Sequence, residues 1–250
     1  MTFTGAIGAA CMLPLRAIIN LSVALGIHPN VLTLIGVLIN VLAAYYLAID
    51  HFVTAGFVMI VANIFDFIDG KVAHITGKQS LFGAFWDSTL DRFSDLALFT
   101  GLIWLYAGHA REGYVLITTL ALIFSIMTSY ARARAESLID KCKVGFMERP
   151  ERIVLFMIGA FTDRMAGVLW VILVLAIITV SNRIHYTYLV LEKKPMPEGW
   201  FARFFFWRDD RATIPYDIWV IVILAFVWLV PPDWISDPTA TGMGLLGFLQ

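Results

Sequence analysis

The chain has 250 residues, of which 60% are hydrophobic, and its mean hydropathy is +0.80. Since soluble domains are only about half apolar, this composition excludes an ordinary water-soluble domain and predicts an all-α integral membrane protein. The formal net charge of -1 gives no reason to expect a nucleic-acid partner.

The N-terminal residues 1–27 are predicted to form an interfacial amphipathic helix, with Arg16 and Asn20 as its polar points. Residues 28–192 follow as a predicted core, in which Pro29 suits the first turn of a helix. Six apolar segments predict six transmembrane helices at 31–49, 52–74, 82–107, 113–136, 151–163 and 165–190. The fifth is short, because a helix needs about 20 residues to cross the hydrocarbon layer.

The C-terminal residues 193–250 form a predicted appendix of unknown role. A charged stretch is followed there by one further apolar run at 214–231, which either crosses the membrane or lies on it.

The positive charges predict the orientation of the core. With the N-terminus inside, thirteen of the 18 lysines and arginines fall on the inner side, and only Arg111 and Arg164 fall outside. Because inner loops are enriched in lysine and arginine, we expect a multi-pass protein of the cytoplasmic (inner) membrane with its N-terminus in the cytoplasm.

Four aspartates interrupt this apolar chain within residues 66–92. Asp66 and Asp69 are three residues apart at the end of one predicted helix, and Asp87 and Asp91 are four apart at the start of the next. Each pair therefore shares one helix face. The linker between them is short, so the two pairs are expected to converge near the cytoplasmic face.

Converging carboxylates must be partly protonated or must surround a cation. Hard divalent ions such as Mg²⁺ suit oxygen ligands, whereas no set of histidines and cysteines favours zinc. Salt bridges to Lys71, Lys78 or Arg92 are the structural alternative. Small residues beside the carboxylates either permit close helix packing or admit a phosphorylated ligand to the metal.

The same stretch resembles the signature of the CDP-alcohol phosphotransferases, D-x-x-D-G-x-x-A-R-(x)8-G-x-x-x-D-x-x-x-D, at every fixed position except the arginine, which is His74 here. The resemblance implies a six-helix membrane core, usually homodimeric. It also implies two divalent ions per site, Mg²⁺ or Mn²⁺, and displacement of CMP from a CDP-linked lipid by an alcohol.

The resemblance also implies roles for residues of this sequence. The metal ligands would be Asp66, Asp69, Asp87 and Asp91, with Asp91 also the general base. The donor-binding residues would be Asn30, Thr33, Asp69, Gly70, Ala73, His74 and Gly83. Histidine is shorter than arginine and mostly neutral at pH 7. Either His74 still contacts the diphosphate, or Lys71 or Lys78 takes its place.

A group of arginines follows further along the chain. Arg132 and Arg134 end the fourth predicted helix, Arg152 begins the fifth, and Arg183 lies near the inner end of the sixth. Arginines at helix ends often reach lipid headgroups, but a basic pocket also suits an anionic acceptor. The stretches "SYARARAE", "GFMERPER" and "NRIH" resemble the phosphatidylinositol phosphate and archaetidylinositol phosphate synthases, in which such residues hold inositol phosphate.

The expected activity is therefore transfer of a phosphatidyl group from CDP-diacylglycerol, or a related CDP-lipid, to inositol phosphate. Glycerol phosphate or another alcohol is the alternative acceptor. Two distant alternatives remain. One is an intramembrane prenyltransferase, because Asn63, Asp66 and Asp69 loosely resemble the first metal motif of such enzymes. The other is a cation or phosphate transporter.

Overall fold

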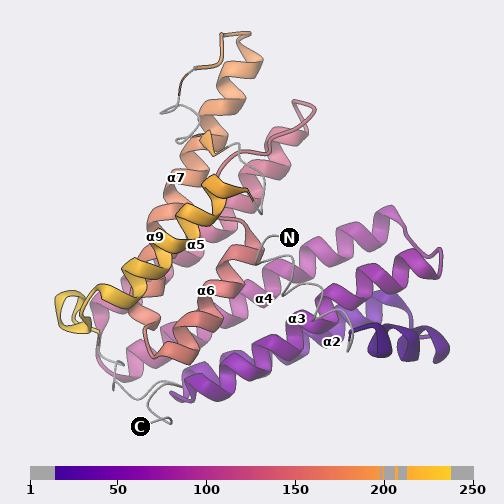
Figure 1. Ribbon diagram of the computed structural model, residues 1–250, viewed down its shortest axis with the longest axis horizontal. Helices are drawn as coiled ribbons and strands as arrows, with labels where there is room; N and C mark the ends of the chain where they lie inside the picture. The colour runs from indigo at the N-terminus through magenta and orange to yellow at the C-terminus, as the bar shows by residue number, and fades with distance from the viewer. Residues whose placement is uncertain (1–14, 198, 200–205, 208–212, 238–250) are drawn as a thin grey trace. The chain divides into compact units, whose positions relative to one another are not determined.

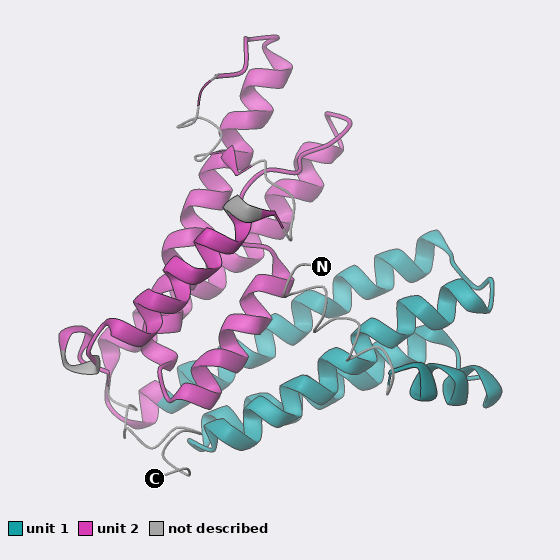
Figure 2. Ribbon diagram, viewed as in Figure 1, with its two compact units in different colours: residues 1–105 teal, residues 106–250 magenta. Residues whose placement is uncertain are grey.

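The computed structural model describes residues 15–197, 199, 206–207 and 213–237. Every regular element among these residues is a helix, so the prediction of an all-helical protein is confirmed (Figure 1). The chain divides into two compact units, residues 1–105 and 106–250 (Figure 2).

The first unit contains α2 (Pro29–Ala48), α3 (Phe52–Ile75) and most of α4 (Leu81–Gly108). Helix α2 begins where His28 caps it, because the His28 Nδ1 accepts a hydrogen bond from the Asn30 N–H at 3.3 Å. Proline at position 29 fits this first turn, since its missing N–H would have no helical partner. Residues 76–80 connect α3 to α4, and Gly77 takes a left-handed conformation there, with φ 64°.

Two glycines allow the helices of the first unit to approach closely. A Cβ added at Gly36 of α2 would lie 3.4 Å from the carbonyl oxygen of Ala62 on α3. At Gly101 of α4 it would lie only 2.3 Å from the carbonyl oxygen of Ala44 on α2. The backbones of α2, α3 and α4 are therefore in near contact, as is common where membrane helices pack.

A short helix, Leu15–Ala24, precedes α2. Its Ile19 packs against Leu32, Ile68 and Val72 of α2 and α3. Leu21 lies on its exposed side, and Leu25, just after the helix, is exposed as well. Of the predicted N-terminal helix, residues 15–24 are thus helical, and one face of this helix packs against α2 and α3. Residues 1–14 lie outside the described part.

The second unit is built around α7 (Met165–Leu191). This helix contacts α5 (Glu112–Glu136), α6 (Arg149–Thr162), α9 (Ile214–Leu229) and the 3₁₀-helix η1 (Pro232–Ile235). Residues such as Ile172 and Ala176 on α7 are completely buried. Helix α6 ends at Asp163, which adopts a left-handed conformation with φ 58°.

Four described helices, α2, α3, α5 and α7, are long and apolar enough to cross a membrane. Helix α4 is long enough but carries Asp87, Asp91, Arg92 and Asp95, and α6 has only 14 residues. Each of the six predicted core segments coincides with one helix. The prediction of a helical membrane protein is therefore supported by the four apolar helices.

Candidate active site

Three of the four predicted aspartates come together in the first unit. Oxygen atoms of Asp66 and Asp69 on α3 and of Asp87 on α4 all lie within 4.8 Å of one another. Asp91 lies one helical turn beyond Asp87 and is half-buried. The turn at residues 76–80 brings the end of α3 to the start of α4, so Asp87 meets the pair formed by Asp66 and Asp69.

Asp69 is the most deeply buried member of this group, with 6% of its surface exposed. The Thr33 hydroxyl on α2 donates to its Oδ2 at 2.5 Å and lies 3.2 Å from the carbonyl oxygen of Pro29. Because a buried carboxylate is unfavourable without hydrogen bonds or a cation, Thr33 both stabilises Asp69 and fixes its orientation.

The donor set fits a divalent metal ion. Three carboxylates offer only hard oxygen atoms, and their mutual distances allow them to converge on one point. Oxygen ligands of this kind suit Mg²⁺ or Mn²⁺. Since the group is assembled from two helices and braced from a third through Thr33, it is held by the core of the first unit rather than by a loop.

A cavity of about 200 Å³ adjoins the carboxylates. It is lined by Pro29, Asn30, Thr33, Asp69, Gly70, Ala73, Lys78, Gln79, Ser80, Gly83, Ala84 and Asp87. Six of the seven predicted donor-binding residues belong to this lining. His74 is the exception: its side chain is exposed and is not part of the wall, whereas Lys78 is.

Small residues keep the wall of this cavity open. A Cβ added at Gly83 would lie 3.1 Å from the Ser80 Oγ and 3.6 Å from the Asn30 Oδ1. At Gly70 the added atom would meet nothing within 4 Å, so a side chain there would extend into open space. Glycine at these two positions therefore preserves room beside the carboxylates.

A second cluster lies in the second unit and is centred on Arg183, which is 2% exposed. Its Nε donates to the carbonyl oxygen of Val144 at 3.0 Å, and its Nη1 donates to that of Thr128 at 2.5 Å. Its Nη2 donates to the Glu148 Oε1 at 3.1 Å. The guanidinium is thus fixed by α5, through Thr128, and by the connection 137–148 that follows it, through Val144 and Glu148.

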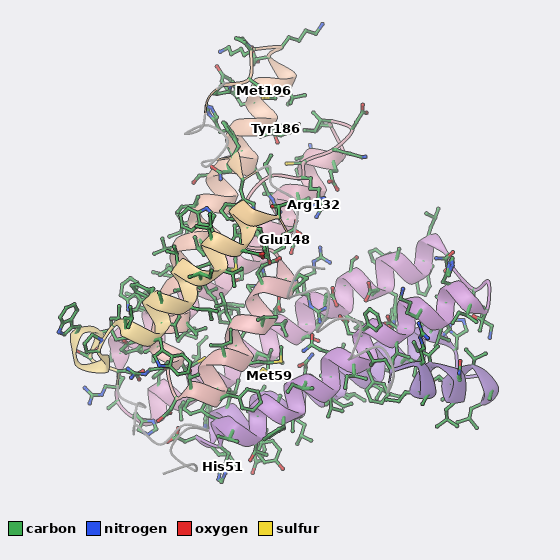
Figure 3. The ribbon with its side chains drawn as sticks, viewed as in Figure 1. His51, Met59, Arg132, Glu148, Tyr186 and Met196 are labelled. Carbon is green, nitrogen blue, oxygen red and sulfur yellow. The ribbon has the colours of Figure 1, made fainter. Side chains whose placement is uncertain are left out.

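Two more of the predicted arginines join this cluster, and Figure 3 labels one of them, Arg132, together with Glu148. The Nη1 of Arg132 donates to the same Glu148 Oε1 at 2.9 Å. Arg152 is 1% exposed, and its Nη1 donates to the Thr128 Oγ1 at 3.3 Å. Arg134 differs, because its side chain is exposed and donates to the Ser137 Oγ at 3.0 Å. The structure therefore gathers Arg132, Arg152 and Arg183 but leaves Arg134 outside the hydrogen-bonded group.

Sequence reasoning missed Glu148, which joins two arginines. The alternation of acidic and basic residues in "ERPER" was a signal for such pairing.

It also missed the contribution of the C-terminal segment. The Gly145 N–H donates to the carbonyl oxygen of Phe206 at 3.1 Å, and the Phe146 ring lies 4.6 Å from that of Trp207. The Tyr216 hydroxyl on α9 donates to the Glu151 Oε1 at 3.2 Å. No feature of the sequence indicates these contacts, since they join segments about 60 residues apart.

A bundle of apolar helices that holds a carboxylate cluster beside a small cavity is typical of membrane enzymes that handle phosphorylated lipids with a divalent metal. The family model described as CDP-alcohol phosphatidyltransferase matches residues 26–181. The chain therefore belongs to the CDP-alcohol phosphatidyltransferase family, as its aspartate signature predicts, and is a CDP-alcohol phosphotransferase.

Named relatives agree with this assignment. The archaetidylinositol phosphate synthase of Pyrococcus horikoshii is 37% identical over 69% of this chain and 89% of its own length. The phosphatidylinositol phosphate synthase of Mycobacteroides abscessus is 34% identical over 64% of this chain and 77% of its own.

Two solved structures of Mycobacterium tuberculosis phosphatidylinositol phosphate synthase, each 31% identical, are also similar. The structure with CDP-DAG bound has a TM-score of 0.66 and matches 70% of this chain and 93% of its own. The structure with manganese and citrate has a TM-score of 0.65 and matches 70% of this chain and 88% of its own.

Proposed function

We propose that this protein transfers a phosphatidyl group from CDP-diacylglycerol, or a related CDP-lipid, to inositol phosphate and releases CMP. The observation that carries the proposal is the convergence of Asp66, Asp69 and Asp87 within 4.8 Å beside a cavity. The names of the relatives support inositol phosphate as the acceptor.

In the proposed reaction, a hydroxyl oxygen of the acceptor forms a bond to the phosphorus that carries the diacylglycerol. The bond from that phosphorus to the bridging oxygen breaks, and CMP leaves with that oxygen. Asp91 receives the hydroxyl proton, as its half-buried position on α4 beside the carboxylate group allows.

Asp66, Asp69, Asp87 and Asp91 are proposed to hold two divalent ions, Mg²⁺ or Mn²⁺. Such ions, when bound, offset the negative charge of phosphate oxygens. The cavity residues Asn30, Thr33, Gly70, Ala73 and Gly83 would accommodate the CDP moiety, and Lys78, which also lines the cavity, would supply a positive charge beside the diphosphate.

Arg132, Arg152 and Arg183 are proposed to bind the phosphate of the acceptor, with Arg134 at the edge of this site. Guanidinium groups suit phosphate because they donate several hydrogen bonds in one plane. Hydrogen bonds to Thr128 hold the buried guanidinium groups of Arg152 and Arg183 in place, which supports this role because pre-oriented donors lose little freedom on binding.

The same proposal covers the placement of the chain. Helices α2 to α7 would form six membrane spans, and the protein would be a homodimer. The helix Leu15–Ala24 would lie at the surface of the membrane, with the N-terminus in the cytoplasm. The site would then face the cytoplasm at the inner membrane. Residues 193–250 would be an appendix to this core, of which residues 198, 200–205, 208–212 and 238–250 lie outside the described part.

The decisive experiment follows CMP release by the purified protein with CDP-diacylglycerol and Mg²⁺. We expect release to require inositol phosphate and to stop when the metal is chelated. Asp87→Asn should abolish release, whereas Ser88→Ala should not, because the Ser88 hydroxyl only donates to the carbonyl oxygen of Phe85. Release that requires glycerol phosphate instead would overturn the acceptor, and release by Asp87→Asn would overturn the metal site.

A further inference from the structure

The carboxylate of Glu148 stands between two arginines of the second unit. Its Oε1 accepts from the Arg132 Nη1 at 2.9 Å and from the Arg183 Nη2 at 3.1 Å. The Glu148 side chain is 23% exposed, whereas that of Arg183 is only 2% exposed. Glu148 is therefore the accessible member of a pair whose cation is buried.

The position of Glu148 in the chain adds to this arrangement. Glu148 is the N-cap residue of α6, yet its side chain makes no capping hydrogen bond to that helix. Acidic N-cap residues usually bond to the helix backbone, so this carboxylate is directed to the arginines instead. It still lies at a helix N-terminus, where a negative charge is favoured.

The bonds of Arg183 limit what else it can contact. Its Nε and Nη1 donate to the main-chain oxygens of Val144 and Thr128, which hold the guanidinium plane in place. Its Nη2 donates to Glu148, the only partly exposed partner of the three. Because Arg183 is almost completely buried, the side on which Glu148 contacts it is the more accessible one, and a phosphate that binds both Arg132 and Arg183 there would take the place of the Glu148 carboxylate.

We propose that Glu148 is an internal anion that holds Arg132 and Arg183 in position until the phosphate group of the acceptor displaces it. The inference rests on the proposed function of the arginines as the acceptor site. A phosphate dianion carries more charge and more acceptor oxygens than a carboxylate, so it can compete for both guanidinium groups. A polyol without phosphate cannot, and Glu148 thereby makes the site selective for phosphorylated acceptors.

The test replaces Glu148 with glutamine, which keeps the shape and one acceptor oxygen but removes the charge. We expect Glu148→Gln to lower the acceptor KM roughly three- to tenfold at unchanged kcat, because a competing charge is removed. Inorganic phosphate should inhibit the variant competitively at a correspondingly lower concentration, while the KM for the CDP-lipid stays the same. A merely structural role would not lower the acceptor KM.

Glu136→Gln is the matched control. Glu136 also accepts from Arg132, through Nε at 3.1 Å, but it lies on α5 one turn from Arg132, whereas the hydrogen bonds of Arg183 go to Val144, Thr128 and Glu148. The acceptor KM should change less in Glu136→Gln than in Glu148→Gln. An equal fall in both variants would overturn the inference, because it would reflect general loss of negative charge.

Two further variants separate the possible failures. Glu148→Asp keeps the charge but withdraws it by one methylene, so its acceptor KM should lie between those of the wild type and Glu148→Gln. A rise or no change in KM in both Glu148 variants would overturn the inference. Arg132→Gln tests the acceptor site itself: a raised acceptor KM keeps the proposed function, and an unchanged KM overturns it together with the inference.

Discussion

The Thr33 hydroxyl on α2 donates a hydrogen bond of 2.5 Å to Oδ2 of Asp69 on α3. One helix thereby orients a carboxylate that belongs to another. Groups that orient metal ligands commonly influence metal affinity as strongly as they influence structure. The first prediction concerns this contact.

We expect Thr33→Val to raise the Mg²⁺ concentration for half-maximal CMP release about tenfold, because the Asp69 carboxylate loses the donor that orients it. Saturating Mg²⁺ should restore most of the rate. Thr76→Val is the control, since the hydroxyl of Thr76, the residue that follows α3, donates to the carbonyl oxygen of Val72 and not to a carboxylate. An unchanged metal requirement in Thr33→Val would show that Thr33 does not position a ligand.

Lys78 and His74 can be compared directly as partners of the donor diphosphate. Lys78 lines the cavity, whereas the exposed His74 does not. We therefore expect Lys78→Gln to raise the KM for CDP-diacylglycerol about tenfold, as for loss of one charged hydrogen bond, and His74→Gln to raise it less. Steady-state kinetics at saturating acceptor measures the KM of both variants. A larger increase in KM for His74→Gln than for Lys78→Gln would show that His74 is the main partner of the diphosphate.

Gly101 tests the close approach of α2 and α4. An added Cβ would lie 2.3 Å from the carbonyl oxygen of Ala44, so Gly101→Ala should lower stability by about 1–3 kcal/mol, the usual cost of overpacking. Gly108→Ala on the same helix is the control, because its added Cβ meets nothing within 4 Å. Thermal unfolding in detergent should give a lower Tm for Gly101→Ala than for Gly108→Ala.

The Cys142 thiol provides a prediction with a defined pH dependence. Burial raises the pKa of this thiol, which lies outside the predicted membrane spans, although a hydrogen bond with Thr187 and the charge of Arg183 oppose the shift. Since the thiolate is the reactive form, maleimide labelling in a Cys11→Ser background should begin to accelerate at a higher pH in the folded protein than in the unfolded one. Coinciding pH profiles would contradict the shift.

Trp207 should hold the segment that contains Cys142 and Phe146. The Trp207 ring lies 4.6 Å from the Phe146 ring, and replacement of Trp207 by alanine removes this contact. We expect Trp207→Ala to speed the labelling of Cys142 severalfold through more frequent local opening. Trp234→Ala is the control, since Trp234 is 80% exposed. Equal labelling rates in the two variants would mean that Trp207 does not stabilise this segment.

The helices and the carboxylates could be predicted because both depend on local spacing. Apolar segments of sufficient length determine where α2, α3, α5 and α7 lie, and the i, i+3 and i, i+4 intervals of the aspartates place each pair on one face. The short connection at residues 76–80 then leaves few ways for the two pairs to meet. The same reasoning did not separate Asp91 from the other three.

The environment of the arginines could not be predicted in the same way. Arg183 on α7 is positioned by Thr128 on α5 and by Val144 and Glu148 in the connection between α5 and α6, which are 35 or more residues away in the chain. No periodicity relates such residues, so their proximity depends on how α5, α6 and α7 pack. The exposure of His74 and the docking of Phe206 near Gly145 depend on tertiary packing for the same reason.

Gly145 is enclosed by a single neighbour on α7. It has a φ of 92°, and an added Cβ would lie 2.5 Å from the Thr179 Cγ2. The Thr179 hydroxyl oxygen also accepts from the Met147 N–H at 3.0 Å. A side chain at position 145 would therefore be strained at this φ and would also clash with Thr179. Truncation of Thr179 to alanine would relieve only the clash and would remove the acceptor of the Met147 N–H. The segment that leads to Glu148 thus depends on glycine at position 145 for its position against α7.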